Sequence, residues 1–190
     1  TGSRVARVLS AAPPPEREAA LAAAWPKAKD PLALRRIARL AGRIRAPNAR
    51  TLLEPLLAHK DERVRSEAAA ALGALGTVDA VPALALALED KSVFVRLEAW
   101  RSLGRVEEPA AYLGRVERLR ADPVEDVRVE YVAALFDRGA PEAIPVLASL
   151  FGDPSWRVAS AALAAAGALG IDDDLPRFTA FLDHRDWRVR

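Results

Sequence analysis

Cysteine is absent from the 190 residues of this chain. Without a thiol, the protein can form neither a disulfide framework nor a cysteine-based metal site or nucleophile. Methionine is absent as well, and the first residue is Thr1. We therefore expect the chain to be a processed product or a piece of a longer protein. Histidine is scarce, with His59 and His184 alone, so candidates for acid–base or metal chemistry are few.

Long apolar runs are also missing. Apolar residues make up 51% of the chain, yet its mean hydropathy is +0.01, because Arg, Glu and Pro interrupt the alanine-rich stretches. No run approaches the roughly 20 residues that cross a bilayer, and the composition is that of a chain that folds in water. No stretch shows the alternation typical of β-strands between hairpin turns. A signal-peptide pattern is absent too, which favours the cytoplasm without fixing the compartment.

A short motif, which reads "DERVR" in one copy, returns along the chain at an almost constant spacing. Its valine recurs after 31, 32, 31 and 31 residues, at Val64, Val95, Val127, Val158 and Val189. The next residue is an arginine except at Ala159, giving Arg65, Arg96, Arg128 and Arg190. Nine residues after the valine stand Gly73, Gly104 and Gly167, with Phe136 as the exception and Gly42 one period earlier. A period of this length indicates a helical repeat array.

Each repeat is predicted to consist of two helices. Asp or Ser stands three residues before the valine, where its side-chain oxygen can cap a helix, at Asp61, Ser92, Ser155 and Asp186. Apolar residues then follow at helical spacing in the first helix. The second helix is expected in "VPALALAL", "AYLGRVERL", "IPVLASLF" and "LPRFTAFL". The periodic arginine is predicted to pair with acidic turn residues of adjoining repeats, namely Asp90, Asp122 and Asp153.

The pattern "VRxEAxxALGxLG" followed by "AVPAL" resembles HEAT repeats, in particular the short bacterial type akin to phycobilisome-lyase HEAT-like repeats. The resemblance implies an all-α fold, a right-handed α-solenoid of about six stacked helical hairpins with the period noted above. It implies first helices on the outer ridge and second helices along the inner surface. It also implies extended surfaces that bind other macromolecules.

On this pattern, residues 1–190 are expected to form a single solenoid. The approximate repeats are 4–26, 27–58, 59–89, 90–121, 122–152 and 153–182. Residues 183–190, "DHRDWRVR", then repeat the opening of another first helix. Because a solenoid needs a polar cap at its end, we expect the natural protein to continue with more repeats or another domain.

Positive charge is concentrated between Lys27 and Leu53. The eight basic residues of this stretch are Lys27, Lys29, Arg35, Arg36, Arg39, Arg43, Arg45 and Arg50, against Asp30 alone. Its net charge of +7 exceeds the +2 of the whole chain, so the other residues carry −5. Arg35, Arg39 and Arg43 recur every four residues opposite an apolar stripe, which predicts a basic ridge. Such a ridge could bind an acidic protein, nucleic acid or anionic lipid, although a solvated outer face gives the same pattern.

Five further residues are candidates for contact with a partner. Arg115, Arg118 and Arg177 are expected to be exposed on the inner, second helices. Trp156 and Trp187 share one repeat position near the start of a first helix, and each precedes an arginine. A tryptophan there can anchor a partner, but it can equally pack into the seam between repeats. Both interpretations remain open.

The sequence gives no support for catalytic, cofactor or metal sites. His59 and His184 share a turn position with Asp90, so we expect them to cap turns. HEAT-like hydroxylases, which resemble this fold, hold iron with His-Glu pairs, but Lys60 and Arg185 follow the histidines here. The residues of HEAT-like DNA glycosylases and of bilin lyases do not carry over either. Neither a Gly-rich phosphate loop nor a GxSxG elbow is present.

We therefore expect a non-catalytic protein–protein interaction scaffold with no cofactor. An acidic protein is the expected partner. Nucleic acid is disfavoured because the later repeats are acidic, whereas nucleic-acid binders usually spread positive charge along the whole track. Two alternatives remain open. The repeats could be an accessory domain of a larger enzyme such as a peptidase, or they could bind nucleic acid through the basic ridge.

Overall fold

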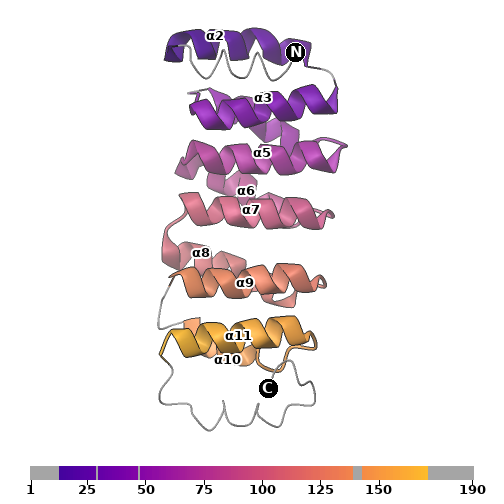
Figure 1. Ribbon diagram of the computed structural model, residues 1–190. Coiled ribbons are helices and arrows are strands. Elements are labelled where there is room, and N and C mark those ends of the chain that lie inside the picture. The colour runs from indigo at the N-terminus through magenta and orange to yellow at the C-terminus, as the bar shows by residue number, and fades with distance from the viewer. Residues whose placement is uncertain (1–12, 29, 47, 139–142, 171–190) are drawn as a thin grey trace. The chain divides into compact units, whose positions relative to one another are not determined.

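The computed structural model of the chain describes residues 13–28, 30–46, 48–138 and 143–170. Within these ranges every regular element is a helix and none is a strand, so the predicted all-α fold is confirmed. The chain forms two compact units (Figure 1). Unit 1 ends at Glu108 and unit 2 begins at Pro109. Among the described residues, no helix combines the length and the apolar character needed to cross a membrane.

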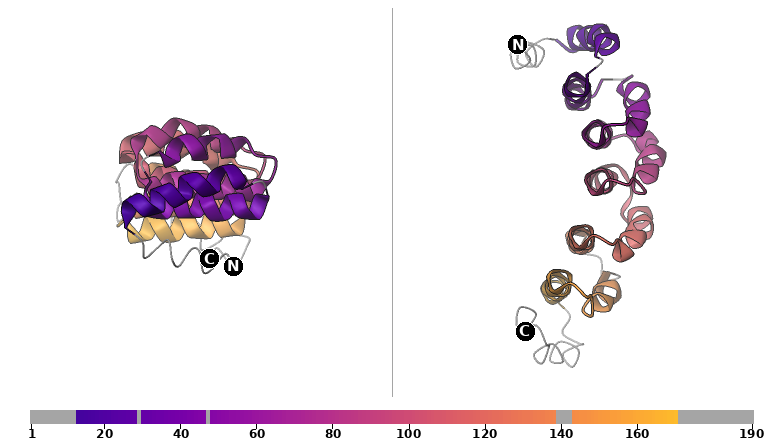
Figure 2. Two further views of the ribbon diagram at one scale, coloured as in Figure 1. Left: turned by 90° about the horizontal axis from the view of Figure 1, so that it is seen from above. Right: turned by 90° about the vertical axis from the view of Figure 1, so that its right-hand side faces the viewer.

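Unit 1 stacks helical hairpins. Its elements are α2 (Pro14–Ala24), η1 (Trp25–Lys27), α3 (Pro31–Ile44), α4 (Ala49–Leu53), η2 (Glu54–Ala58), α5 (Glu62–Leu75), η3 (Val78–Ala80), α6 (Val81–Ala87) and α7 (Val93–Val106). The first helices α3, α5 and α7 pack side by side in one layer, and the shorter second helices α4 and α6 form another (Figure 2). Each repeat therefore buries its apolar stripe against its neighbours.

Unit 2 repeats the same plan. Its elements are α8 (Pro109–Val116), η4 (Glu117–Ala121), α9 (Glu125–Arg138), α10 (Ala143–Ser149) and α11 (Trp156–Ala168). The first helices α9 and α11 pack side by side, and the second helix α10 contacts both of them. Two helices per repeat, as the sequence predicts, thus recur in both units.

The periodic valines are the fixed points of the core. Val64, Val95 and Val158 are fully buried and Val127 is nearly so, while Val189 lies outside the described residues. On α5 the apolar stripe continues through other fully buried side chains, of which Leu72 is the largest. Burying a valine or leucine contributes roughly 1.5–3 kcal/mol, so this register is what holds each first helix in place.

The predicted helix caps are confirmed in one repeat and corrected in two. The Asp61 carboxylate accepts hydrogen bonds from the backbone N–H groups of Arg63 and Val64, at 2.8 and 3.3 Å. Ser92 and Ser155 occupy the N-cap positions of α7 and α11, but neither side chain caps its helix. In both turns the aspartate two residues earlier accepts from the serine's own N–H at 2.8 Å, Asp90 in one turn and Asp153 in the other. Asp186 lies outside the described residues.

The predicted arginine–aspartate pairing is confirmed at two places. Arg65 donates from Nε and Nη2 to the two carboxylate oxygens of Asp90, at 2.7 and 2.8 Å. Arg128 makes the same paired bonds to Asp153, both at 2.8 Å. Each arginine also donates to backbone carbonyls in the turn before its own helix, such as that of His59 at 2.9 Å. The arginine thus ties its own turn to the next one along the chain.

The periodic glycine permits close packing of neighbouring first helices. A Cβ on Gly42 would lie 2.8 Å from the Cα of Ala71, and one on Gly73 would lie 2.8 Å from the Cα of Ser102. At this crossing Ser102 donates from Oγ to the Ala69 carbonyl at 2.9 Å, in the buried space between α5 and α7. Only glycine lets the two backbones approach this closely.

Candidate functional site

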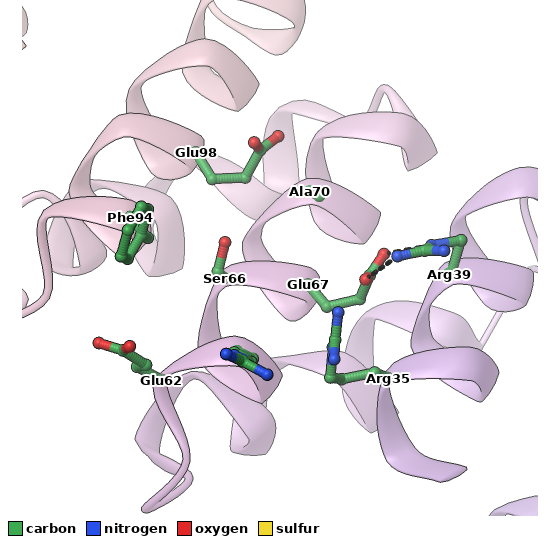
Figure 3. A pocket seen from close by; sticks show the side chains of 9 residues that line it. Arg35, Arg39, Glu62, Ser66, Glu67, Ala70, Phe94 and Glu98 are labelled. Carbon is green, nitrogen blue, oxygen red and sulfur yellow. Dashed lines mark hydrogen bonds and ion pairs between the residues drawn. The ribbon is translucent and has the colours of Figure 1, made fainter. Parts of the chain in front are cut away.

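An open groove of about 450 Å³ crosses the first helices of unit 1. We name it the α5 groove, because α5 lies in its centre and forms its floor with Ser66 and Ala70 (Figure 3). One wall carries Arg35 and Arg39 from α3, and the other carries Phe94 and Glu98 from α7. The groove is thus built by three consecutive repeats.

The groove arises from a difference in side-chain size at equivalent repeat positions. Ser66 and Ala70 on α5 stand 31 residues after Arg35 and Arg39 on α3. The helix in the middle therefore presents short side chains where its neighbour presents long ones, and a hollow forms over it. Because these positions point away from the core, the repeat pattern leaves them free to vary.

Arginines and glutamates line the α5 groove in equal number, and one pair of them is already matched. Arg39 donates from Nε to Glu67 Oε1 at 2.8 Å and from Nη2 to Oε2. This hydrogen bonding, together with the charge of Glu67, raises the pKa of the Arg39 guanidinium. The side chain of Arg39 remains 60% exposed, so the pair contributes little to stability. The predicted basic ridge therefore has one of its cations neutralised from the next helix.

Arg35 and Arg63 differ from Arg39 because they form no ion pair with any described residue. The side chain of Arg35 points into the groove from α3 (Figure 3) and is only partly exposed. Its Nε is buried and has no hydrogen-bond partner among the residues that the structure describes. A buried donor without an acceptor costs free energy, and such groups in folded proteins call for an explanation such as strain or a bound water or ion.

Replacing Arg35 by methionine should leave the protein at least as stable as the wild type. Methionine keeps an apolar stem of similar length but removes the buried donor, whose desolvation costs on the order of 1–3 kcal/mol. We expect the free energy of unfolding, measured by urea titration, to rise by about 1 kcal/mol. Arg36→Met is the matched control, since Arg36 is exposed on the same helix, outside the groove. A clear loss of stability in Arg35→Met alone would mean that Arg35 has a structural role.

Phe94 is the functional candidate that sequence reasoning missed. Its side chain is 62% exposed at the start of α7 and lines the groove. It occupies the repeat position just before the anchor valine, which Leu32 fills on α3 and Arg63 on α5. Both Leu32 and Phe94 are exposed, so an apolar, a basic and an aromatic residue succeed one another along the rim. An aromatic residue at a position that is charged in most repeats, as at Arg63, Asp126, Arg157 and Arg188, is the signal that could have found it.

The remaining predicted contact residues do not join this groove. Arg43 is exposed in the last turn of α3. Arg115 on α8 and Arg118 in η4 belong to unit 2, and each interacts with other residues. Trp156 begins α11 with 37% of its side chain exposed and also has an interaction partner. Arg177 and Trp187 lie outside the described residues.

Unit 2 has a groove of a different kind. It lies between α9 and α11, has a volume of about 280 Å³ and is lined by valine, alanine and Phe136. Phe136 stands at the repeat position of Gly42 and Gly73, and its ring is partly exposed. This groove offers apolar contact without the charged groups of the α5 groove.

The histidine prediction is confirmed for His59. Its Nδ1 accepts a hydrogen bond from the Asp61 N–H at 3.0 Å, the role that Asp90 plays one repeat later. His184 lies outside the described residues. Among those residues, no group of three or more His, Cys, Asp or Glu side chains is placed to hold a metal ion. The α5 groove thus offers guanidinium groups, carboxylates and an aromatic ring, which suit binding by hydrogen bonds and apolar contact.

Two solved structures are similar to this chain at low sequence identity. A solved structure of human deoxyhypusine hydroxylase in complex with glycerol is 17% identical, with a TM-score of 0.49, and the match covers 100% of this chain and 92% of that one. A crystal structure of an engineered protein is 20% identical, with a TM-score of 0.46. The match covers 99% of this chain and 91% of that one. At these values the similarities carry no inference about activity. No curated protein sequence matches the chain.

A family model adds the decisive match. The model for HEAT repeats matches residues 56–113 and 112–190, which together are well over half of the chain. These residues include all five anchor valines and the arginine–aspartate pairs of both units. The chain therefore belongs to the HEAT-repeat family.

Proposed function

We propose that this chain is a non-catalytic HEAT-repeat module that binds a protein partner through the α5 groove and its rim. The observation that carries the proposal is that one groove is lined by an exposed aromatic ring, Phe94, and by two arginines, Arg35 and Arg63. Neither arginine forms an ion pair with a described residue. Aromatic residues and arginine dominate the energetics of protein–protein interfaces. A HEAT-repeat array supplies the rigid frame on which such a surface stays in place.

The charge of the α5 groove favours a protein over a nucleic acid. Three glutamates line it beside the three arginines: Glu62, Glu67 and Glu98. A phosphate backbone needs a run of cations, and carboxylates in the same groove repel it. A protein segment, in contrast, can match both signs. The same binding role would serve a free scaffold or an accessory domain of a larger enzyme.

Photo-crosslinking tests this proposal directly. Benzoylphenylalanine in place of Phe94 keeps an aromatic ring on the rim, and the same residue in place of Leu86 serves as the comparison. Leu86 is 76% exposed on α6, in the layer of second helices. In lysate of the source organism, we expect position 94 to give a discrete crosslinked protein and position 86 to give none.

Filling the groove then shows whether the crosslink depends on it. Ala70→Trp places a large ring on the floor, and Ala74→Trp places the same ring one turn further along α5, outside the groove. The crosslink from position 94 should disappear with Ala70→Trp and persist with Ala74→Trp. A partner captured only from position 86 would move the binding surface to the second helices, and equal crosslinking with both tryptophans would reject the groove.

A further inference from the structure

The donors of the α5 groove without an ion pair come from one wall and from the central helix. Arg35 projects into the groove from α3, and Arg63 belongs to the first turn of α5. Neither has an ion pair with a described residue, whereas Arg39 is held by both oxygens of Glu67. Phe94 stands across the floor on α7. A ligand that crosses the groove therefore meets guanidinium donors from α3 and α5 and an aromatic ring from α7.

We propose that the α5 groove binds an extended segment of the partner in which a carboxylate lies close to a large apolar side chain. The carboxylate accepts hydrogen bonds from Arg35 and Arg63, and the apolar side chain packs on Phe94 and over Ala70. This inference rests on the proposed function and specifies the chemistry of the partner at that same site. The occupant is thus an acidic peptide segment.

A carboxylate is the group that satisfies these donors best. Arginine presents planar N–H donors, accepts nothing and stays charged, so it selects oxygen anions with two acceptors. Because the Nε of Arg35 is buried, a carboxylate in the groove would bond to the terminal N–H groups of its guanidinium. Glu98 on the opposite wall keeps the lining as a whole free of excess positive charge. A single carboxylate placed beside the arginines is therefore favoured over a polyanion.

The size of the groove indicates an extended peptide. Packed helices lie about 8–10 Å apart, so a groove that crosses three of them runs roughly 16–20 Å. An extended chain advances about 3.3 Å per residue, which places about five or six residues along that length. A carboxylate and an apolar side chain a few residues apart can then reach Arg35 and Phe94 together.

Selection from a display library of random dodecapeptides tests the inference with the full chain as bait. We expect the enriched peptides to contain Asp or Glu within a few residues of Phe, Tyr, Trp or Leu. For the most enriched peptide, synthesised with a fluorophore, the dissociation constant is measured by anisotropy. Arg35→Gln combined with Arg63→Gln should weaken binding about ten- to hundredfold. Arg36→Gln, on the same helix but outside the groove, should leave it unchanged.

Further variants separate this inference from the proposed function. Peptides blocked by Ala70→Trp and weakened by Phe94→Ala, yet free of acidic residues and unaffected by the arginine variants, would overturn the acidic occupant and leave the groove as a binding site. Peptides that bind equally well to Ala70→Trp would overturn both, as would a selection without enrichment. Since Arg35 makes no ion pair, the arginine variants should unfold at a temperature no lower than that of the wild type, which is measured in parallel.

Discussion

Replacing Asp90 by alanine is expected to destabilise the protein by about 3–5 kcal/mol, because it leaves the charge of Arg65 buried without a counter-ion. Arg65 is only 5% exposed and donates to both oxygens of Asp90, at 2.7 and 2.8 Å. The substitution also removes the acceptor for the Ser92 N–H. Urea unfolding of the full chain, followed by circular dichroism, should show a lower midpoint for the transition of unit 1.

Glu67→Ala is the matched control for this experiment. It too removes a carboxylate from a paired arginine, but Arg39 remains in contact with water, so the expected loss is only about 0–1 kcal/mol. If the two variants lost equal stability, the Arg65–Asp90 pair would be no more structural than a surface ion pair. Burial of the arginine is therefore the property that the comparison isolates.

Acid titration gives a second measure of the Asp90 contribution. Burial alone would raise the pKa of the Asp90 carboxyl, but hydrogen bonds from Arg65 and from the Ser92 N–H outweigh it and lower that pKa below its ordinary value of 3.8. A carboxyl whose pKa is lower in the folded state stabilises the fold above its unfolded pKa and loses that effect as the pH falls through its folded pKa. The stability difference between wild type and Asp90→Ala should therefore be full above about pH 5 and shrink below pH 4.

A comparison of the repeats indicates why this turn position holds an aspartate in some repeats and a histidine in others. Where the preceding first helix carries the arginine, the following turn carries aspartate, as with Arg65 and Asp90. Leu34 fills the arginine position of α3, and the turn that follows holds His59 instead. His59 still accepts the backbone N–H that such a turn must satisfy, but no arginine requires its charge. The sequence shows the same exchange at Ala159 and His184.

The fold could be predicted from the sequence because repetition multiplies weak signals. A single Val-Arg dipeptide says little, but valines spaced by 31 or 32 residues fix the register of the first helices, and Val64, Val95 and Val158 are indeed fully buried. The pairing of Arg65 with Asp90 could be predicted for the same reason, since both residues recur. The N-caps were only partly predictable, because a serine hydroxyl can bond to another group, as that of Ser155 does to Glu125.

The α5 groove could not be predicted, because it depends on differences between repeats rather than on what they share. A count of charges along residues 27–53 treats Arg39 as a free cation, yet Glu67, 28 residues later, binds it from the next helix. The resemblance to HEAT repeats led us to expect contacts on the second helices, whereas the α5 groove and the unit 2 groove both open over first helices. The groove forms where short side chains on one helix lie beside long ones on the next, and only the stacked structure shows which residues these are.

Replacing Gly73 by alanine is expected to destabilise the protein by about 1–3 kcal/mol, although alanine is the better helix former. The new Cβ would lie 2.4 Å from Ser102 Oγ and 2.8 Å from Ser102 Cα. The side chain of Ser102 could rotate away only by giving up its buried hydrogen bond to the Ala69 carbonyl, and its Cα could move only with α7. The free energy of unfolding from urea titration measures the loss.

Gly167→Ala is the control, because Gly167 stands at the same repeat position on α11 and no described atom lies within 4 Å of its added Cβ. There the helix propensity of alanine acts alone, and we expect a gain of about 0.5–1 kcal/mol. A gain in both variants would show that α5 and α7 can separate at little cost, so that the periodic glycine would reflect something other than close packing. A loss at Gly73 with a gain at Gly167 would locate the requirement in the contact between α5 and α7, since the two substitutions are chemically identical and differ only in the helix that faces them.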